Sequence, residues 1–278
     1  MTPEIALRAA ALLGEGPTWD PAAGRLLWVD ILRSEIHRYD PSGGRDEVLD
    51  VPQHVGAAKP CRGGGLVLNL RDGVALRSPA GDLTWLSRFP DDPDVRGNDA
   101  TVGPDGAFWA GTMRYDEAAG GGALRRVTPD GATTTVFPDV TVSNGLAWSP
   151  DRTLAYYVDS PTGRVDVFPA EAPERRAPFV RIPPPGFPDG LTVDADGCVW
   201  VAMWSGGRVH RFTPDARLDR TIELPAAQTT SCAFGGEGLR DLYVTSATAK
   251  APPGDALAGS LFVIPDAGQG LPPLPFPA

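Results

Sequence analysis

Cysteine and long apolar runs are both scarce in this chain of 278 residues. The three cysteines, Cys61, Cys198 and Cys232, are odd in number and widely spaced. This pattern excludes a disulfide framework or a cysteine-based zinc site and predicts reduced, mostly buried thiols. No run of 18 apolar residues occurs, so no segment is expected to span a membrane. Residues 1–13 lack the basic and apolar regions of a signal peptide. We therefore expect a cytoplasmic protein that does not bind membranes.

Positive charge is also in short supply. The chain has 25 lysine and arginine residues against 35 aspartate and glutamate residues, which gives a net charge of −10. Proteins that bind nucleic acid usually present a basic face, so no nucleic-acid partner is expected. The chain has no Gly-x-Ser-x-Gly motif, phosphate-binding loop or dinucleotide fingerprint. The enzymes that depend on those motifs are therefore disfavoured.

Glycine and proline, in contrast, are abundant, with 33 and 30 residues spread along the chain. Turn formers between short apolar runs are typical of a protein with many strands. The stretch 188–202, PDGLTVDADGCVWVA, shows the basic unit: a short strand, an Asp/Gly turn and an apolar strand, which together predict a hairpin. Similar stretches recur, and the polar residues at their heads are separated by 39 to 46 residues: Glu15, Lys59, Asn98, Asn144, Asp189 and Ser231.

A second landmark recurs independently with a similar period. The strand 36–39 runs into a turn at Pro41, and the same happens before five more prolines: Pro79, Pro129, Pro169, Pro214 and Pro265. Six units of about four strands, repeated every ~40 to 50 residues, are the signature of a β-propeller. We predict an all-β fold in which residues 1–278 form a single six-bladed β-propeller domain with four antiparallel strands per blade. A β-sandwich would leave both recurring landmarks unexplained. The first strand, within residues 5–12, is expected to complete the sixth sheet.

The residues at the heads of the six units predict a ring around the propeller axis, because equivalent repeat positions lie at equivalent places in the blades. Four of them, Glu15, Asn98, Asn144 and Asp189, carry carboxylate or amide oxygens, and no histidine or cysteine joins them. Hard oxygen ligands suit Ca²⁺, Mg²⁺ or Mn²⁺ better than Zn²⁺. Taken singly, each residue is better explained as one that caps a strand end or satisfies a turn than as a metal ligand. Taken as a ring, they favour a divalent metal site.

Two long connections are expected on the same face as this ring. They lie between the second and third strands of the third and sixth units, at 114–122 and 247–259. Long loops on one face of a rigid scaffold often carry function, although the run 120–122 of three glycines is also compatible with a disordered excursion. Arg96 and Asp99 would offer a guanidinium and a carboxylate to a polyhydroxylated ligand at the channel mouth; a solvated surface pair is the alternative.

At these residues the chain resembles the senescence marker protein/gluconolactonase/luciferin-regenerating enzyme family, the regucalcin-like sugar lactonases. The resemblance covers almost the whole chain. It is carried by short motifs whose order and spacing are specific: LGEGP at 13–17, RGND at 96–99, AGTM at 110–113, SNGL at 143–146, PDG at 188–190, GGRV at 206–209, TTSC at 229–232 and LYVT at 242–245. The family is a six-bladed propeller with one catalytic divalent cation, which agrees with the fold predicted from the repeat.

The resemblance also implies roles for individual residues. It makes Glu15, Asn144 and Asp189 the metal ligands, with Ca²⁺ favoured by ligand type and Zn²⁺, Mg²⁺, Mn²⁺ or Fe²⁺ as alternatives. It makes Arg96, Asn98 and Asp99 substrate-contacting residues. The family places a further carboxylate in the loop after the AGTM motif, and Asp116 and Glu117 both fit that position. Lys59 departs from the family pattern, which has an uncharged residue near this position.

The resemblance implies a lactonase, a carboxylic ester hydrolase of the gluconolactonase or arabinonolactonase type, whose partner is a small sugar lactone. In this hypothesis the cation polarises the lactone carbonyl and lowers the pKa of a bound water, and Asp189 is the general base. Two alternatives remain open at this stage. The same propeller and metal could hydrolyse organophosphates or other esters, or the chain could be a calcium-binding propeller without enzymatic activity.

Overall fold

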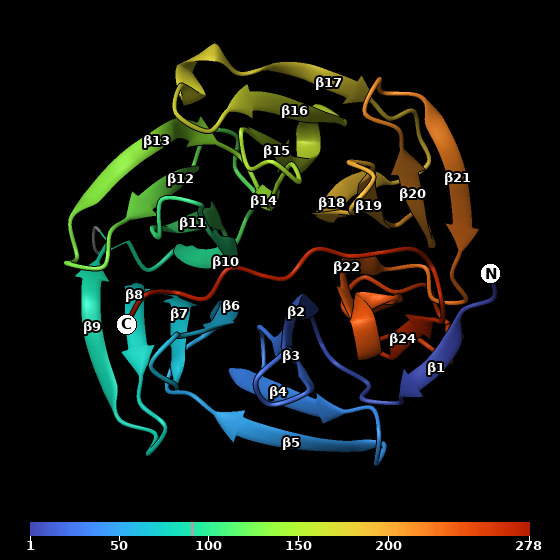
Figure 1. Ribbon diagram of the computed structural model, residues 1–278, viewed down its shortest axis with the longest axis horizontal. Helices are drawn as coiled ribbons and strands as arrows, with labels where there is room; N and C mark the ends of the chain where they lie inside the picture. Colours follow the sequence, from blue (N-terminus) through green and yellow to red (C-terminus); the bar gives the residue numbers. More distant parts are fainter. Residues whose placement is uncertain (90–91) are drawn as a thin grey trace.

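The computed structural model describes residues 1–89 and 92–278. Its strands form six four-stranded antiparallel sheets that follow one another as blades around a common axis (Figure 1). The predicted six-bladed β-propeller is thus confirmed. No helix in the described part of the chain is long and apolar enough to cross a membrane.

The first three blades are each built from four consecutive strands. Blade 1 contains β2 (Gly14–Asp20), β3 (Arg25–Asp30), β4 (Glu35–Asp40) and β5 (Arg45–Asp50). Blade 2 contains β6 (Val55–Pro60), β7 (Leu66–Leu70), β8 (Gly73–Arg77) and β9 (Leu83–Arg88). Blade 3 contains β10 (Val95–Val102), β11 (Phe108–Arg114), β12 (Gly122–Val127) and β13 (Thr133–Val140).

Blades 4 and 5 repeat this plan, with short 3₁₀ turns in some connections. Blade 4 contains β14 (Ser143–Trp148), β15 (Leu154–Asp159), β16 (Arg164–Pro169) and β17 (Ala177–Arg181), with η1 (Ser160–Thr162) and η2 (Pro173–Arg175) between strands. Blade 5 contains β18 (Phe187–Val193), β19 (Val199–Trp204), β20 (Arg208–Phe212) and β21 (Leu218–Glu223).

Blade 6 combines the two ends of the chain. It contains β22 (Thr229–Gly235), β23 (Asp241–Ser246) and β24 (Leu261–Ile264), with η3 (Glu237–Leu239) before β23. Its outermost strand is β1 (Glu4–Leu7), which pairs antiparallel with β24. In Figure 1 the blue first strand lies beside the red blade. The expected completion of the sixth sheet by the first strand is confirmed, and this pairing closes the ring.

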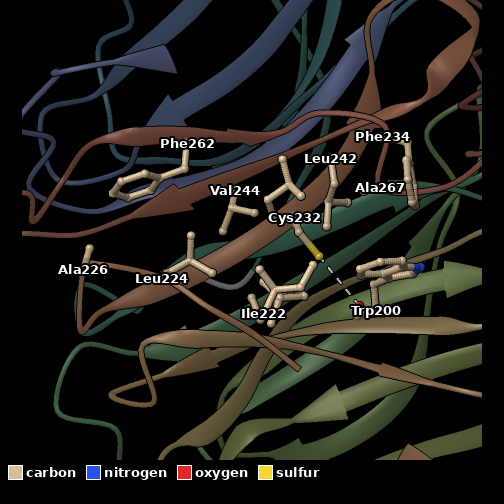
Figure 2. Close-up of a cluster of buried hydrophobic side chains, with 13 residues drawn as sticks. Trp200, Ile222, Leu224, Ala226, Cys232, Phe234, Leu242, Val244, Phe262 and Ala267 are labelled. Carbon is tan, nitrogen blue, oxygen red and sulfur yellow. Dashed lines mark hydrogen bonds between the residues drawn. The ribbon is translucent and has the colours of Figure 1, made fainter. Parts of the chain in front are cut away.

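The hydrophobic core lies between neighbouring blades. One cluster joins blades 5 and 6 through Trp200 of β19, Ile222 of β21, Cys232 of β22, and Val244 and Phe262 of blade 6, all buried (Figure 2). The Cys232 thiol points to the backbone oxygen of Trp200 at 3.7 Å. Strands near the axis are apolar on both faces because a blade lies on each side of them. Cys61, Cys198 and Cys232 are all free thiols, and the latter two are buried, as predicted.

Candidate functional site

The innermost strand of each blade carries a β-bulge near its N-terminal end. In β10, for example, Gly97 pairs with Thr112 and Ala100 pairs with Ala110, so two residues lie opposite one. The same two-against-one arrangement interrupts β2, β14 and β18. A bulge bends its strand and changes the direction of the side chains beside it. Asn98, Asn144 and Asp189 each occupy the first unpaired position.

Tight packing of the inner strands against one another explains the glycines that follow two of these residues. A Cβ atom on Gly145 would lie 2.6 Å from the backbone nitrogen of Leu191, and one on Gly190 would lie 2.0 Å from Ser231 Oγ. Only glycine fits at such an approach. The Asn-Gly and Asp-Gly pairs of the sequence therefore combine a polar side chain with close contact between blades.

The register of the structure corrects two members of the predicted ring. In β6 and β22 the unpaired residues are Gly56 and Thr230, so these positions are equivalent to Asn98, and Lys59 and Ser231 lie further along their strands. Gly56 offers no side chain, and the Thr230 hydroxyl donates to the Gly14 carbonyl at 2.5 Å. The ring of oxygen ligands is therefore limited to blades 1, 3, 4 and 5. Counting from Gly56 and Thr230 instead of Lys59 and Ser231 makes the spacing between the units more even, and this regularity could have indicated the register from the sequence.

All six inner strands run in the same direction, and the described residues line a cavity at each end of these strands. The loop-side cavity, of about 490 Å³, lies at the N-terminal ends and is lined by Glu15, Arg96, Asn98, Asn144 and Asp189 together with apolar side chains. The tail-side cavity, of about 170 Å³, lies toward the C-terminal ends and is lined by Lys59, Asp99 and Ser231 among others.

A chain of hydrogen bonds fixes the polar side chains of the loop-side cavity. Asn144 Nδ2 donates to Ser160 Oγ at 2.9 Å, so its oxygen Oδ1 points the other way and accepts from Asn98 Nδ2 at 3.1 Å. Asn98 Nδ2 also donates to the Ser143 carbonyl at 2.8 Å, and Arg96 Nη1 donates to Asn98 Oδ1 at 2.7 Å. The orientation of both amides is thereby determined.

The two buried carboxylates of this cavity, Glu15 and Asp189, are only partly compensated by the nearby charge of Arg96. Burial, followed by the charge of Asp99, raises the pKa of Glu15 to about 8. Burial, followed by the charges of Glu15 and Asp99, raises the pKa of Asp189 well above its usual value. Asp189 Oδ1 is buried and has no hydrogen-bond partner among the described residues. A buried polar atom without a partner is costly, so a ligand is expected there.

The donor set of the loop-side cavity fits a divalent cation. Two carboxylates and the oriented Asn144 oxygen are the hard ligands that Ca²⁺ and Mg²⁺ prefer, and a bound cation would remove the repulsion between Glu15 and Asp189. The described residues contain no cluster of three or more histidine, cysteine, aspartate or glutamate side chains suited to a metal. Any metal site here therefore depends on the amide of Asn144 as well as on the two carboxylates.

The structure divides the predicted substrate-contacting residues. Arg96, Asn98 and Glu117 line the loop-side cavity. Asp99, in contrast, lines the tail-side cavity and accepts a hydrogen bond from the Ala100 backbone at 2.7 Å, because neighbouring residues of the β10 bulge point to different ends of the axis. Asp116 is exposed and is held by Arg114 Nε at 3.0 Å and by the Ala118 backbone at 3.1 Å. Of the two candidate loop carboxylates, Glu117 is the one on the cavity.

Both long loops border the loop-side cavity, as predicted from their place in the sequence. Tyr115 and Glu117 come from the connection between β11 and β12, and Ala249 and Lys250 come from that between β23 and β24. The Tyr115 hydroxyl lies 2.6 Å from His54 Nδ1.

Sequence reasoning missed three side chains that matter here. Ser160, in η1, orients Asn144. Asn69, in β7, is fully buried and donates to the backbone oxygens of Asn98 and Gly111 at 2.9 and 2.8 Å. Lys250 lies at the cavity mouth. Ser160 and Asn69 stand outside the repeated motif, so the period gave no signal for them. Lys250 falls within the predicted long loop, which was a partial signal.

The family of the chain follows from a comparison of its sequence with family models. The model described as the SMP-30/Gluconolactonase/LRE-like region matches residues 13–248, from the start of blade 1 into blade 6. The chain belongs to this family. The resemblance drawn from the short motifs is thereby confirmed, and the site residues of blades 1, 3, 4 and 5 all lie within the matched segment of the SMP-30/gluconolactonase/LRE-like family.

Similar proteins of known name cover nearly the same length. The 6-deoxy-6-sulfogluconolactonase of Pseudomonas putida is 38% identical over 255 residues, which are 88% of this chain and 87% of the relative. The pentonolactonase XacC of Haloferax volcanii is 35% identical over 285 residues, covering 98% and 97%. A solved structure of regucalcin from Agrobacterium tumefaciens, described as a calcium-binding protein, has a TM-score of 0.94 at 31% identity and covers 99% of this chain and 97% of that one.

Proposed function

We propose that the protein is a metal-dependent lactonase that hydrolyses a sugar aldonolactone to the open-chain sugar acid. The observation that carries this proposal is the convergence of Glu15, Asn144 and Asp189 with Arg96 and Asn98 in one cavity, where Asp189 Oδ1 is buried without a partner. Relatives named as lactonases for sulfogluconolactone and pentonolactone support the reaction class. The relative described as a calcium-binding protein supports the metal.

The cation of this proposal is held by Glu15, Asn144 and Asp189, and Ca²⁺ is favoured by the oxygen ligands. When bound, it supplies positive charge that polarises the lactone carbonyl and acidifies water. The protein's own contribution is to fix these oxygens before the ligand arrives. Ser160 and Asn98 hold the Asn144 amide, and the Gly16 backbone donates to Glu15 Oε2 at 3.1 Å.

Asp189 is the proposed general base. Its unpartnered Oδ1 accepts a proton from water while the water oxygen forms a bond to the lactone carbonyl carbon. The ester bond between that carbon and the ring oxygen then breaks, and the proton returned to the ring oxygen gives a hydroxyl. The product is one open-chain sugar acid for each lactone and water consumed. Because Arg96 favours the ionised form of Asp189, it helps to keep the base able to accept the proton.

Arg96, Asn98 and Glu117 are the proposed contacts for the sugar. Arg96 is buried, and its Nη1 is held by the Gly97 carbonyl at 2.9 Å as well as by Asn98. This fixes the plane of the guanidinium and directs its other donors. Hydroxyl groups both donate and accept, so a wall with a guanidinium, an amide and a carboxylate suits a polyol better than an apolar ester.

A substrate panel tests this function. Protein treated with a chelator is returned to Ca²⁺, Mg²⁺, Mn²⁺, Zn²⁺ or Fe²⁺ and assayed with a pH indicator on glucono-, galactono-, xylono- and arabinonolactone, beside a nitrophenyl phosphotriester. We expect lactone turnover that is lost with the chelator and restored by at least one cation. Faster hydrolysis of the phosphotriester would identify an organophosphate hydrolase instead. Calorimetric Ca²⁺ binding with no hydrolysis of any substrate would identify a non-enzymatic calcium binder.

A further inference from the structure

An ion pair crosses the mouth of the loop-side cavity. Lys250 Nζ donates to Glu117 Oε1 at 2.6 Å. Glu117 belongs to the long loop of blade 3 and Lys250 to the long loop of blade 6. In a ring of six blades these two are opposite one another, as Figure 1 shows for β11 and β24. The pair therefore spans the opening above Glu15, Asn144 and Asp189 rather than lying along one edge of it.

The backbone holds both residues of the pair in a defined position. Glu117 and Lys250 each have a φ of 57°, in the left-handed region that non-glycine residues seldom adopt. The Lys250 carbonyl accepts from Gln228 Nε2 at 2.6 Å, and Gln228 is itself buried and bound to Ser205. The Glu117 backbone donates to the Arg114 carbonyl at 3.1 Å. Unfavourable backbone conformations that persist in an anchored loop often mark a ligand contact.

The choice of lysine at this position is unusual within the chain. Only two of its 25 basic residues are lysines, Lys59 and Lys250, and these two line the two cavities of the central axis. A lysine ammonium is a compact charge with three donors, whereas arginine presents a planar fork. One donor of Lys250 reaches Glu117. The side chain is 62% exposed, so its remaining donors are open to a ligand in the mouth.

The cavity combines buried polar groups, an exposed ion pair and apolar side chains. Glu15 and Asp189 are buried, the Glu117–Lys250 pair is exposed, and the lining also includes Met113, Phe187 and Trp204. A ligand that reaches from the buried carboxylates to the exposed pair needs polar groups at both ends and carbon–hydrogen surface for the apolar side chains. A sugar lactone whose carbonyl lies near the buried carboxylates has this pattern, because its remote hydroxyls then reach the pair.

We propose that Lys250 is a substrate-recognition residue which, with Glu117, binds the hydroxyls at the end of the lactone remote from the reacting carbonyl. The inference rests on the proposed lactonase function. A donor beside an acceptor matches a hydroxyl, which is both. An anionic group at the same place would gain the ammonium but face the Glu117 carboxylate, so the pair favours a neutral, hydroxylated end over a phosphorylated or sulfonated one.

Chemical labelling tests this contact without relying on turnover. An amine-acetylating reagent should modify exposed Lys250 but not buried Lys59, and mass spectrometry of the peptide that contains Lys250 measures the rate. With gluconolactam, a lactone analogue that resists hydrolysis, at saturation, we expect acetylation of Lys250 to slow at least several-fold while that of the N-terminal amine is unchanged. Unchanged acetylation of Lys250 with the lactam bound, or failure of the lactam to bind, would overturn the proposal.

Kinetics of matched variants separate recognition from loop stability. For Lys250→Met we expect the KM for gluconolactone to rise about tenfold, because one hydrogen bond to a charged group is lost. The kcat should stay within about twofold of the wild type. The KM for butyrolactone, which has no remote hydroxyl, should rise far less. Glu117→Gln should raise the kcat/KM for 6-phosphogluconolactone relative to that for gluconolactone, because the carboxylate that opposes an anionic group is removed. Arg240→Met is the control, because it removes an exposed pair, Arg240 Nε to Asp266 at 2.7 Å, outside both cavities.

The outcomes distinguish this inference from the proposed function. If Lys250→Met lowers activity on butyrolactone and gluconolactone equally, Lys250 supports the loop and does not recognise hydroxyls. If the wild type hydrolyses lactones and neither variant changes the preference among them, the proposed lactonase function is supported and the proposed role of Lys250 is wrong. If no lactone is hydrolysed with any cation, the lactonase itself fails.

Discussion

The two ends of the central axis are built from the same six strands and differ in how their charges are compensated. At the loop side, Glu15 and Asp189 line the same cavity, and the charge of Glu15 raises the pKa of Asp189. At the tail side, the buried Lys59 ammonium donates to Thr18 Oγ1 at 2.6 Å and to the Gly16 carbonyl at 3.2 Å. The Asp99 carboxylate opposes the lowering of the Lys59 pKa by burial. One end is therefore complete without a ligand, and the other is not.

The two ends of the axis also differ in the parts of the chain that cover them. The C-terminal segment crosses the middle of the ring (Figure 1), and its residues Leu271 and Leu274 line the tail-side cavity. It forms β-bridges from Gly270 to Asp194 and from Phe276 to Cys61, and Phe276 is fully buried. The loop-side cavity is spanned by the exposed Glu117–Lys250 pair, and such pairs contribute little stability. The propeller thus closes one end with its own chain and leaves the other accessible.

Replacement of the unpartnered carboxylate should give the largest effect of all. Asp189→Asn keeps the shape of the side chain but removes its charge, so the proposed cation ligand and the proposed general base should both be lost. We expect lactone turnover to fall by about 10³-fold, which a pH-indicator assay measures, and Ca²⁺ affinity by calorimetry to fall as well. In Asp99→Asn, at the tail side, lactone turnover should fall by less than about tenfold. An equal loss of turnover in both variants would indicate that Asp99 contacts the substrate, as the RGND motif implies. The two ends of the axis would then not be functionally separate.

Removal of the tail-side ammonium should act on stability instead. Lys59→Met removes the donor to Thr18 Oγ1 and to the Gly16 carbonyl, between which a long hydrogen bond of 3.4 Å remains, and it leaves Asp99 without its nearby positive charge. We expect a loss of about 3 kcal/mol in the free energy of unfolding, measured by urea denaturation. The KM for lactone in the folded fraction should be unchanged. A variant as stable as the wild type would show that water reaches the tail-side cavity and replaces the ammonium.

The sequence was sufficient for the fold and for most of one site. Asn98, Asn144 and Asp189 could be found because each precedes a turn at a fixed place in the repeat. Lys59 was placed in the ring because spacing alone does not locate the bulge, which in β6 lies at Gly56. Asp99 was assigned to the substrate from the RGND motif, whereas in the structure Asp99 lines the tail-side cavity and its neighbour Asn98 the loop-side cavity. The contact between Glu117 and Lys250 joins residues 133 positions apart, and no local pattern indicates it.

The pH dependence of the metal-free protein should sharpen the comparison further. Because the pKa of Glu15 is about 8 in the folded chain, against 4.5 for an ordinary glutamate, the folded state retains a proton that the unfolded state releases between these values. Stability should therefore fall as the pH rises from 5 to 8. We expect a lower Tm at pH 8 than at pH 5 in chelator-treated protein, and a larger rise on adding Ca²⁺ at pH 8. The same scan on Glu15→Gln should be flatter, and an identical slope would contradict this origin.

Thiol labelling should give the smallest effect, because the cysteines lie away from the loop-side cavity. Burial raises the pKa of Cys61 to about 11, so only about one thiol in a thousand is ionised at pH 8. Cys198 and Cys232 are buried, and burial raises the pKa of both. We expect slow reaction of the folded protein with a disulfide reagent, three thiols after denaturation, and lactone turnover within about twofold of the untreated protein after Cys61 is labelled. Rapid labelling with loss of turnover would show that changes at the tail side reach the proposed metal ligands, so that the two ends are not independent.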